Sequence, residues 1–404
     1  MLRSRLVAVA PNPSIDRLVE VAAFRHGEIH RPLATTTVAG GKGFNVARVA
    51  AALGAEVTAI GPLAGHAGRW IAEALEAEGL EVSAVWTEGE TRTCTSVLDR
   101  SDDSMTEIYE AGATSGVDDW RRLLETLEAA LARSGATEVA LVTASGSLPP
   151  GVPDDGLEQI VRCALAAGFR IAVDGHGPAL RRALAARPWL VKVNLDEARD
   201  ALGEPAISPE SAVRAMISAG ALHAVVTAGR DGAVMALEDD SLIRLRPPVQ
   251  GAHTVGVGDA FLGGFAVGIM QGEDLRGAAV MGIATASASA LVPGAGRIDV
   301  ASVARLRSEV GVSSWTPFNW ASAPKRSASA SPNRSPVRVI RDADPEATSA
   351  IALSTSPTSD DSRRRVSSGS GLAVVRGWSS SMPSGSPRLQ EATRGESPTA
   401  LKLV

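Results

Sequence analysis

The sequence predicts an α/β fold in which a mostly parallel central sheet has helices on both faces and a small β-sheet lies outside it. Short apolar runs of strand length alternate with longer amphipathic helical patterns through most of the chain. Such alternation implies βαβ units and a parallel sheet. Two stretches, at about 14–38 and 91–110, interrupt this alternation with β-branched residues and turn signals. They predict small antiparallel strands outside the main sheet, which form a lid.

The elements follow in chain order from these patterns. The expected strands of the main sheet are 5–10, 56–63, 138–145, 170–175, 190–195 and 223–229. The expected helices include 45–54, 68–80, 157–168 and 210–220. In sheets of this kind, ligands bind outside the carboxyl ends of the strands, so the loops that follow the strands are the places to look for function.

The composition changes after about Val312, where the chain becomes rich in Ser, Pro and Arg without periodicity. We therefore expect a folded domain over 1–312 and a disordered tail over 313–404. The tail has twelve Lys/Arg against seven Asp/Glu, which leaves a net charge of -10 on the folded part, since the whole chain carries -5. An acidic domain argues against nucleic acid as the main partner. The tail is either a solvated extension or a segment that binds an acidic partner.

Cysteine usage and hydropathy indicate a cytoplasmic protein. Cys94 and Cys163 lie far apart and fit no metal-binding spacing, so we expect reduced thiols. The first apolar run is too short for a secretory signal, and no run of about 20 apolar residues predicts a membrane crossing.

The stretch AGGKGFNVARVAAALG (39–54) is the first candidate binding loop. Glycines including Gly41 let the backbone approach a ligand, Lys42 adds a positive charge, and Asn45 is expected to open a helix. The spacing is neither that of a P-loop nor that of a dinucleotide fingerprint. A generic glycine turn before a helix is the alternative.

The stretch TVGVGDAFLGGFAVGI (254–269) is the second candidate. Backbone N–H groups from Gly256 through Asp259, with Val257 and Gly258 between them, would converge at a helix N-terminus and bind an anion. A carboxylate would repel that anion, but it makes sense as the base that takes a proton from an attacking hydroxyl. The alternative is that Asp259 caps the helix.

Further polar groups follow other strands. Asp16 comes after the first strand, and SGSLPPGVP (145–153) is a Gly/Pro-rich turn at another strand end. VVTAGRDGA (225–233) is a strand that runs into a glycine turn, and Arg92 is suited to bidentate binding of a phosphate or carboxylate. VKVNLDEA adds Lys192, Asn194 and Glu197 at one strand end. Solvated charges and plain turns are the alternatives for these segments.

Taken together and in this order, the motifs resemble the phosphofructokinase-B (PfkB) branch of the ribokinase-like carbohydrate kinases, especially its 1-phosphofructokinase and tagatose-6-phosphate kinase members. The resemblance covers roughly 5–310. GGKGFNVA and TVGVGDAFLGGF correspond to the two family signatures, and SGSLPPGVP is typical of the sugar-phosphate subgroup. The resemblance implies a ribokinase-like fold whose β-lid serves as a homodimer interface.

The resemblance also implies roles for individual residues. Asp259 matches the catalytic base, and the anion hole consists of Gly256, Val257 and Gly258. The residues implied to hold the sugar phosphate are Asp16, Gly41, Lys42, Asn45 and Arg92. The residues implied to surround the nucleotide are Lys192, Asn194, Glu197, Thr227, Gly229 and Gly232. No direct metal ligand is implied, since Mg²⁺ is expected to be held through nucleotide phosphates and water near Glu197.

The implied activity is ATP-dependent phosphorylation of a ketohexose phosphate to a bisphosphate, as in the conversion of fructose 1-phosphate to fructose 1,6-bisphosphate. The alternatives are a tagatose-6-phosphate or fructose-6-phosphate kinase, a free-sugar kinase, and a non-catalytic sugar-phosphate sensor. The chain has DGHG (174–177) where many 1-phosphofructokinases have DTSG, and TEIYEAGA (106–113) where many have TEINEPGP. His176 and Tyr109 therefore distinguish its substrate side. Val193 replaces the proline of the family's KPN triplet.

Overall fold

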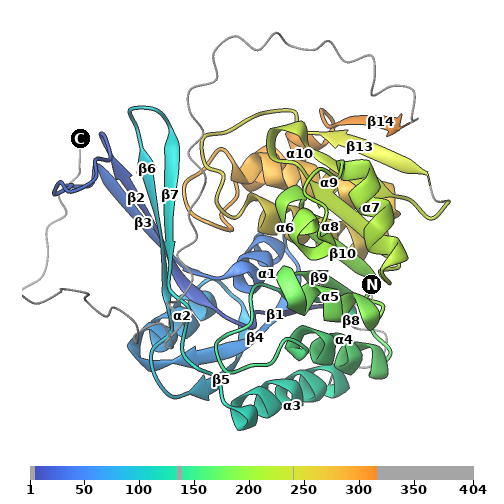
Figure 1. Cartoon of the computed structure of the whole chain (residues 1–404), viewed down its shortest axis with the longest axis horizontal. Coiled ribbons are helices and arrows are strands. Elements are labelled where there is room, and N and C mark those ends of the chain that lie inside the picture. Colours follow the sequence, from blue (N-terminus) through green and yellow to red (C-terminus); the bar gives the residue numbers. More distant parts are fainter. Residues whose placement is uncertain (1–4, 134–138, 240, 316–404) are drawn as a thin grey trace, which may run out of the picture. The chain divides into compact units, whose positions relative to one another are not determined.

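The computed structural model describes residues 5–133, 139–239 and 241–315. Its main sheet contains β1 (Arg5–Val9), β4 (Glu56–Ala64), β5 (Glu81–Thr87), β8 (Val139–Ser145), β9 (Ile171–Asp174), β10 (Leu190–Asn194), β11 (His223–Thr227), β12 (Ala233–Ala236), β13 (Leu242–Arg246) and β14 (Gly311–Trp315). Their order is β14-β13-β12-β11-β10-β9-β8-β1-β4-β5. From β11 to β5 all neighbours are parallel, and β12 to β14 continue the sheet antiparallel. This confirms the predicted mostly parallel sheet (Figure 1).

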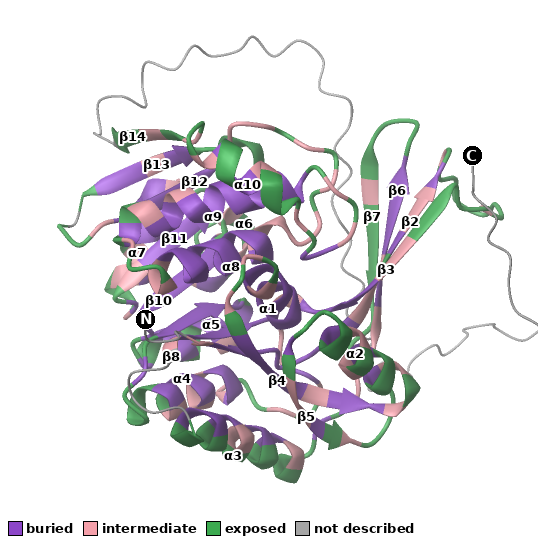
Figure 2. Cartoon of the chain, turned by 180° about the vertical axis from the view of Figure 1, so that it is seen from behind, coloured by how far each residue is buried: buried purple, intermediate pink, exposed green. Residues whose placement is uncertain are grey.

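Helices cover both faces of this sheet, as the alternation along each strand requires. They are α1 (Lys42–Ala52), α2 (Gly65–Ala77), α3 (Val117–Arg133), α4 (Gly156–Ala166), α5 (Gly177–Ala185), α6 (Leu195–Leu202), α7 (Pro209–Ser218), α8 (Val257–Met270), α9 (Leu275–Ser289) and α10 (Val300–Arg307). In β1, Leu6 and Ala8 belong to the core that includes α1, α2, α8, α9 and α10, whereas Val7 and Val9 belong to the core with α3 to α7. Figure 2 shows the central strands buried between the two layers.

A second, four-stranded sheet stands apart from the main one (Figure 1). It consists of β2 (Ser14–Val21), β3 (Ala34–Gly40), β6 (Thr93–Asp99) and β7 (Ser104–Tyr109), in the order β3-β2-β6-β7. β2 and β6 pair in parallel, and the outer pairs are antiparallel. The two β-branched stretches of the sequence thus form one small separate sheet, as expected, but the expectation of antiparallel strands is wrong for its central pair, because the two stretches join it as two hairpins whose first strands pair in parallel.

Several boundaries differ from the sequence expectations; the helix expected over 68–80, for example, spans Gly65–Ala77. The helix expected to open at Asn45 begins at Lys42, directly after its N-cap Gly41. The predicted tail was to start at 313, but β14 continues to Trp315 because it pairs with β13 along its length. The rest of that tail, 316–404, lies outside the described residues. Within the described ranges, no helix is long and apolar enough to cross a membrane.

Candidate active site

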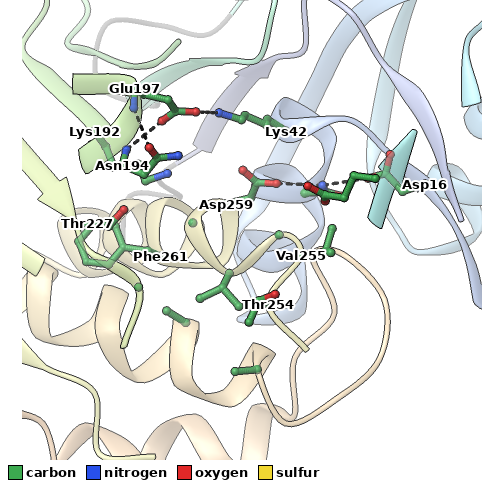
Figure 3. Close-up of a pocket in the computed structure, with 18 of the residues that line it drawn as sticks. Asp16, Lys42, Lys192, Asn194, Glu197, Thr227, Thr254, Val255, Asp259 and Phe261 are labelled. Carbon is green, nitrogen blue, oxygen red and sulfur yellow. Dashed lines mark hydrogen bonds and ion pairs between the residues drawn. The ribbon is translucent and has the colours of Figure 1, made fainter. Parts of the chain in front are cut away.

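A cavity of about 680 Å³ lies at the carboxyl ends of the central parallel strands. Its lining comes from the small sheet, from the loops after β8 to β11, and from α1, α8 and α9. Every residue that the sequence analysis assigned to catalysis, sugar phosphate or nucleotide lines this one cavity. Figure 3 shows Asp16, Lys42, Lys192 and Glu197 around Asp259. Residues more than 240 positions apart in the chain are therefore gathered at one site.

Asp259 is the buried carboxylate at the centre of the cavity. It is the third residue of α8, whose N-cap is Gly256, so the alternative that it caps the helix is wrong. Its Oδ2 accepts a hydrogen bond from Asn45 Nδ2 at 2.9 Å. Burial and the neighbouring charge of Asp174 raise the pKa of Asp259 to about 7, against the opposing effects of Lys192 and Lys42. A carboxylate with a pKa near neutrality is suited to accept a proton in catalysis.

The loop beside Asp259 is a glycine turn that leads into the N-terminus of α8. Gly256 has φ 78°, a left-handed conformation that glycine adopts without a Cβ penalty. A Cβ on Gly258 would lie 2.6 Å from Lys192 Nζ, so the missing side chain lets the ammonium approach the first turn of α8. The helix N-terminus and the ammonium together form a positive pocket that suits a phosphoryl group.

Asp174 forms ion pairs with two lysines of this site, Lys42 and Lys192. It is fully buried at the end of β9, with Oδ1 2.9 Å from Lys42 Nζ and Oδ2 2.6 Å from Lys192 Nζ. Burial alone would raise its pKa, but the two ammonium groups lower the pKa of Asp174 to about 2. The sequence analysis noted 174–177 but did not place Asp174 in the site. Its position at the carboxyl end of a central strand was the available signal.

Lys42 and Glu197 extend this cluster toward α6. Lys42 Nζ lies 2.6 Å from Glu197 Oε1. Burial lowers the pKa of Lys42, but the carboxylates of Asp174 and Glu197 outweigh burial and hold it above its usual range. Glu197 also forms a capping box with Asn194: Asn194 N donates to Glu197 Oε2 and Glu197 N donates to Asn194 Oδ1, both at 2.8 Å. The capping box fixes the start of α6 and the position of the Glu197 carboxylate.

Asp16 is held rigidly on β2 at the end of the cavity next to the small sheet. Its Oδ1 accepts from Ser14 Oγ at 2.6 Å, and its Oδ2 accepts from Gly41 N at 3.2 Å and from Asn45 Nδ2 at 3.3 Å. The Asn45 amide thus bridges the carboxylates of Asp16 and Asp259. A ligand hydroxyl bound by Asp16 would therefore lie close to Asn45, which contacts Asp259.

Arg92 precedes β6 at the same end of the cavity. Its Nη1 donates to Glu110 O at 3.1 Å and its Nη2 to Asn12 O at 2.8 Å. The buried Nε has no hydrogen-bond partner among the described residues, which leaves this guanidinium incompletely satisfied. Tyr109 and Glu107 of β7 line the cavity nearby, and the Tyr109 hydroxyl donates to the Glu107 carboxylate.

The opposite end of the cavity is less polar. Thr227, Gly229 and Gly232, which the family resemblance assigns to the nucleotide, line the cavity at the turn after β11. Sequence reasoning missed the facing wall, which contains Val249 and the α9 residues Ile283 and Ala286. A slot with small apolar walls suits the flat face of a nucleobase. The many small residues of α9 were the only sequence signal for this wall.

Comparisons with known proteins agree with this geometry. Residues 10–300 match the model of the pfkB family carbohydrate kinases. The chain is 33% identical over 286 residues to a 1-phosphofructokinase of Haloferax volcanii, an alignment that covers 70% of this chain and 90% of that protein. It is 34% identical over 274 residues to a 1-phosphofructokinase of Rhodobacter capsulatus, covering 67% and 85%.

Solved structures show the same fold. Phosphofructokinase-2 from Escherichia coli, in complex with potassium, superposes with a TM-score of 0.67 at 28% identity, covering 76% of this chain and 99% of that one. For fold alone, a possible 1-phosphofructokinase from Thermotoga maritima gives a TM-score of 0.68 at 22% identity, covering 77% and 100%. Because the family model spans most of the chain and its signature residues meet in one cavity, the chain belongs to the pfkB family of ATP-dependent carbohydrate kinases.

Proposed function

We propose that the protein phosphorylates fructose 1-phosphate with ATP to give fructose 1,6-bisphosphate and ADP. The observation that carries this proposal is the buried Asp259, with a pKa raised to about 7, in the first turn of α8 next to the N-cap glycine Gly256. Two relatives support the choice of substrate, since those from Haloferax volcanii and Rhodobacter capsulatus are 1-phosphofructokinases.

In this reaction Asp259 accepts the proton of the free primary hydroxyl of the sugar. The hydroxyl oxygen forms a bond to the γ-phosphorus, the bond from that phosphorus to the bridging oxygen breaks, and its electron pair leaves with ADP. Backbone N–H groups of Gly256, Val257 and Gly258, together with Lys192, stabilise the charge on the phosphoryl oxygens. Most of the rate enhancement then comes from positioning and electrostatics.

We assign the two ends of the cavity to the two substrates. Asp16 and Asn45 orient the sugar hydroxyls, with Gly41 and Lys42 beside them, and Arg92 binds the phosphate that the sugar already carries. The unpartnered Nε of Arg92 supports this assignment. Thr227, Gly229 and Gly232 contact the nucleotide at the apolar end.

The donor set fits a magnesium ion that is held mainly by nucleotide phosphates and water. No group of three or more His, Cys, Asp or Glu side chains in the described part of the chain forms a metal cage. Mg²⁺ characteristically keeps several waters and binds one or two carboxylates plus substrate phosphates. Glu197 would reach it through water, and the ion would neutralise charge on the β- and γ-phosphates.

We also propose a cytoplasmic homodimer that associates through the small sheet. Ile108 of β7 is 60% exposed, and Leu33, next to β3, is 66% exposed, so apolar side chains of this sheet face solvent. Both cysteines of the described chain are free thiols, as in a reducing compartment. Sedimentation of an Ile108→Lys variant tests the dimer: a monomer supports it, and an unchanged dimer contradicts it.

The activity is tested by measuring ADP release with fructose 1-phosphate, tagatose 6-phosphate, fructose 6-phosphate and free fructose. We expect the highest kcat/KM with fructose 1-phosphate. Asp259→Asn should lower kcat by about 10²–10⁴-fold, because it removes the base, while the affinity for ATP changes little. Near-normal turnover of this variant contradicts the mechanism. Tight sugar-phosphate binding without ADP release from any substrate would instead favour a non-catalytic sensor.

A further inference from the structure

Arg48 is a buried arginine of α1 that lies outside the lining of the cavity. The residue is only 6% exposed, and four hydrogen bonds fix its guanidinium. Nε donates to Glu78 Oε2 at 2.6 Å, Nη1 donates to Asn45 Oδ1 at 3.2 Å and to Ala295 O at 3.4 Å, and Nη2 donates to Ala39 O. A charged side chain this far from water needs such a set of acceptors.

These contacts connect three parts of the active site. Ala39 is in β3 of the small sheet, and Asn45 is the amide that bridges the two carboxylates. Ala295 lies against the anion-binding turn, since a Cβ on Gly256 would be 2.9 Å from its Cα. The Arg48 guanidinium therefore holds together β3 of the small sheet, the Asn45 amide that contacts Asp259, and the segment at Ala295 that lies against Gly256.

The hydrogen-bond partners of Asn45 fix which way its side-chain amide faces. A guanidinium has only donors, and an ionised carboxylate has only acceptors. With Oδ1 of Asn45 facing Arg48, Nδ2 must face Asp16 and Asp259. If Asp259 takes up a proton, its carboxyl group becomes a donor, and a flipped amide would then stabilise the protonated form. Arg48 opposes that flip, because a flipped amide would turn its NH₂ group toward the guanidinium.

We propose that Arg48 is a positioning residue for the phosphoryl transfer: it locks the Asn45 amide so that the amide stabilises only the ionised, proton-accepting form of Asp259. This inference rests on the proposed function, in which Asp259 is the base. The other charged groups that face Asp259 are Asp174, Lys192 and Lys42. None of them is hydrogen-bonded to Arg48, so Asn45 is the hydrogen-bonded link between Arg48 and the base.

The test compares Arg48→Met with Arg244→Met. Arg244 is a partly buried arginine on β13 whose Nη2 lies 2.5 Å from Glu210 Oε1, outside the cavity lining, so it controls for the loss of an ion-paired guanidinium. For Arg48→Met we expect the acidic limb of the kcat/KM profile to move up by about one pH unit. We expect kcat to fall by about 10–100-fold while KM for ATP stays within about twofold. Arg244→Met should lose thermal stability without moving the limb.

Four outcomes overturn or separate the claims. An unmoved limb in Arg48→Met, with kcat equal to that of Arg244→Met, shows that Arg48 only stabilises the fold. If Arg48→Met does not fold, hydrogen exchange of the Asn45 side-chain amide in the wild-type chain tests the proposal instead. A locked amide exchanges slowly, and exchange at the rate of a free amide refutes the lock. Normal turnover of Asp259→Asn would refute the proposed function itself, whereas an inactive Asp259→Asn beside an unaltered Arg48→Met refutes only the role of Arg48.

Discussion

Replacing Asp174 by Asn tests whether the buried charge cluster tunes the base. The carboxylate of Asp174 accepts from Lys192 Nζ at 2.6 Å and from Lys42 Nζ at 2.9 Å. It also raises the pKa of Asp259 by like-charge repulsion. Neutralising Asp174 removes that repulsion and leaves both ammonium groups free to act on Asp259. Both effects lower the pKa of Asp259, so the acidic limb of kcat/KM should move down by about one unit.

The same substitution has a cost in stability that can be worked from the pKa of Asp174. That pKa falls from the usual 3.8 to about 2 in the folded protein, which corresponds to roughly 2 kcal/mol of unfolding free energy. Because the folded pKa is depressed, this stabilisation is complete above about pH 4 and is lost as pH falls toward 2. The difference between wild type and Asp174→Asn should therefore be constant at neutral pH and shrink in acid.

Two assays check these expectations. ADP release measured between pH 5 and pH 9 gives the acidic limb, and urea unfolding at pH 7 and at pH 3 gives the free energies. A limb that stays in place or moves to higher pH would refute the electrostatic coupling of Asp174 to Asp259. A loss of stability below about 1 kcal/mol at pH 7 would show that the two lysines find other partners of equal strength.

Three further predictions concern the base, the anion-binding turn and the sugar phosphate. Asp259→Asn should raise the melting temperature above pH 7 but not at pH 4. The pKa of Asp259 is raised from 3.8 to about 7 in the folded protein, so the buried charge costs up to roughly 4 kcal/mol of unfolding free energy above pH 7. Equal melting temperatures of wild type and variant at pH 8 would contradict this. Gly258→Ala should lower kcat by at least about tenfold, because its Cβ would lie 2.6 Å from Lys192 Nζ, and unchanged kinetics would show that the lysine is not needed there. Arg92→Ala should raise KM for the sugar phosphate by at least about tenfold and leave KM for ATP unchanged in steady-state assays, whereas an unchanged KM for every sugar phosphate would favour a free-sugar substrate.

The sequence determined the architecture because it depends on local patterns, whereas the list of site residues came from the family resemblance of several motifs taken together. Apolar runs of strand length and amphipathic helical runs indicate parallel βαβ units, and glycine loops at strand ends indicate where ligands bind. Gly41 and Gly256 belong to such loops, and both line the cavity. The strands β12, β13 and β14 at one end of the sheet and β5 at the other were not expected, because short strands next to polar turns carry little periodic signal.

Only the tertiary structure decided how the charges of the site are paired. Lys42 and Lys192 share the carboxylate of Asp174, although Lys42 is 132 positions away from it in the chain. Asn45 faces Asp259 across 214 positions, and Arg48, an ordinary position in the helical pattern, fixes that amide. Such partners depend on strand order and on the packing of α1 against α8, which no local pattern specifies. The sequence therefore singled out Asp259, and the folded structure determines the burial and the neighbouring charges that raise its pKa.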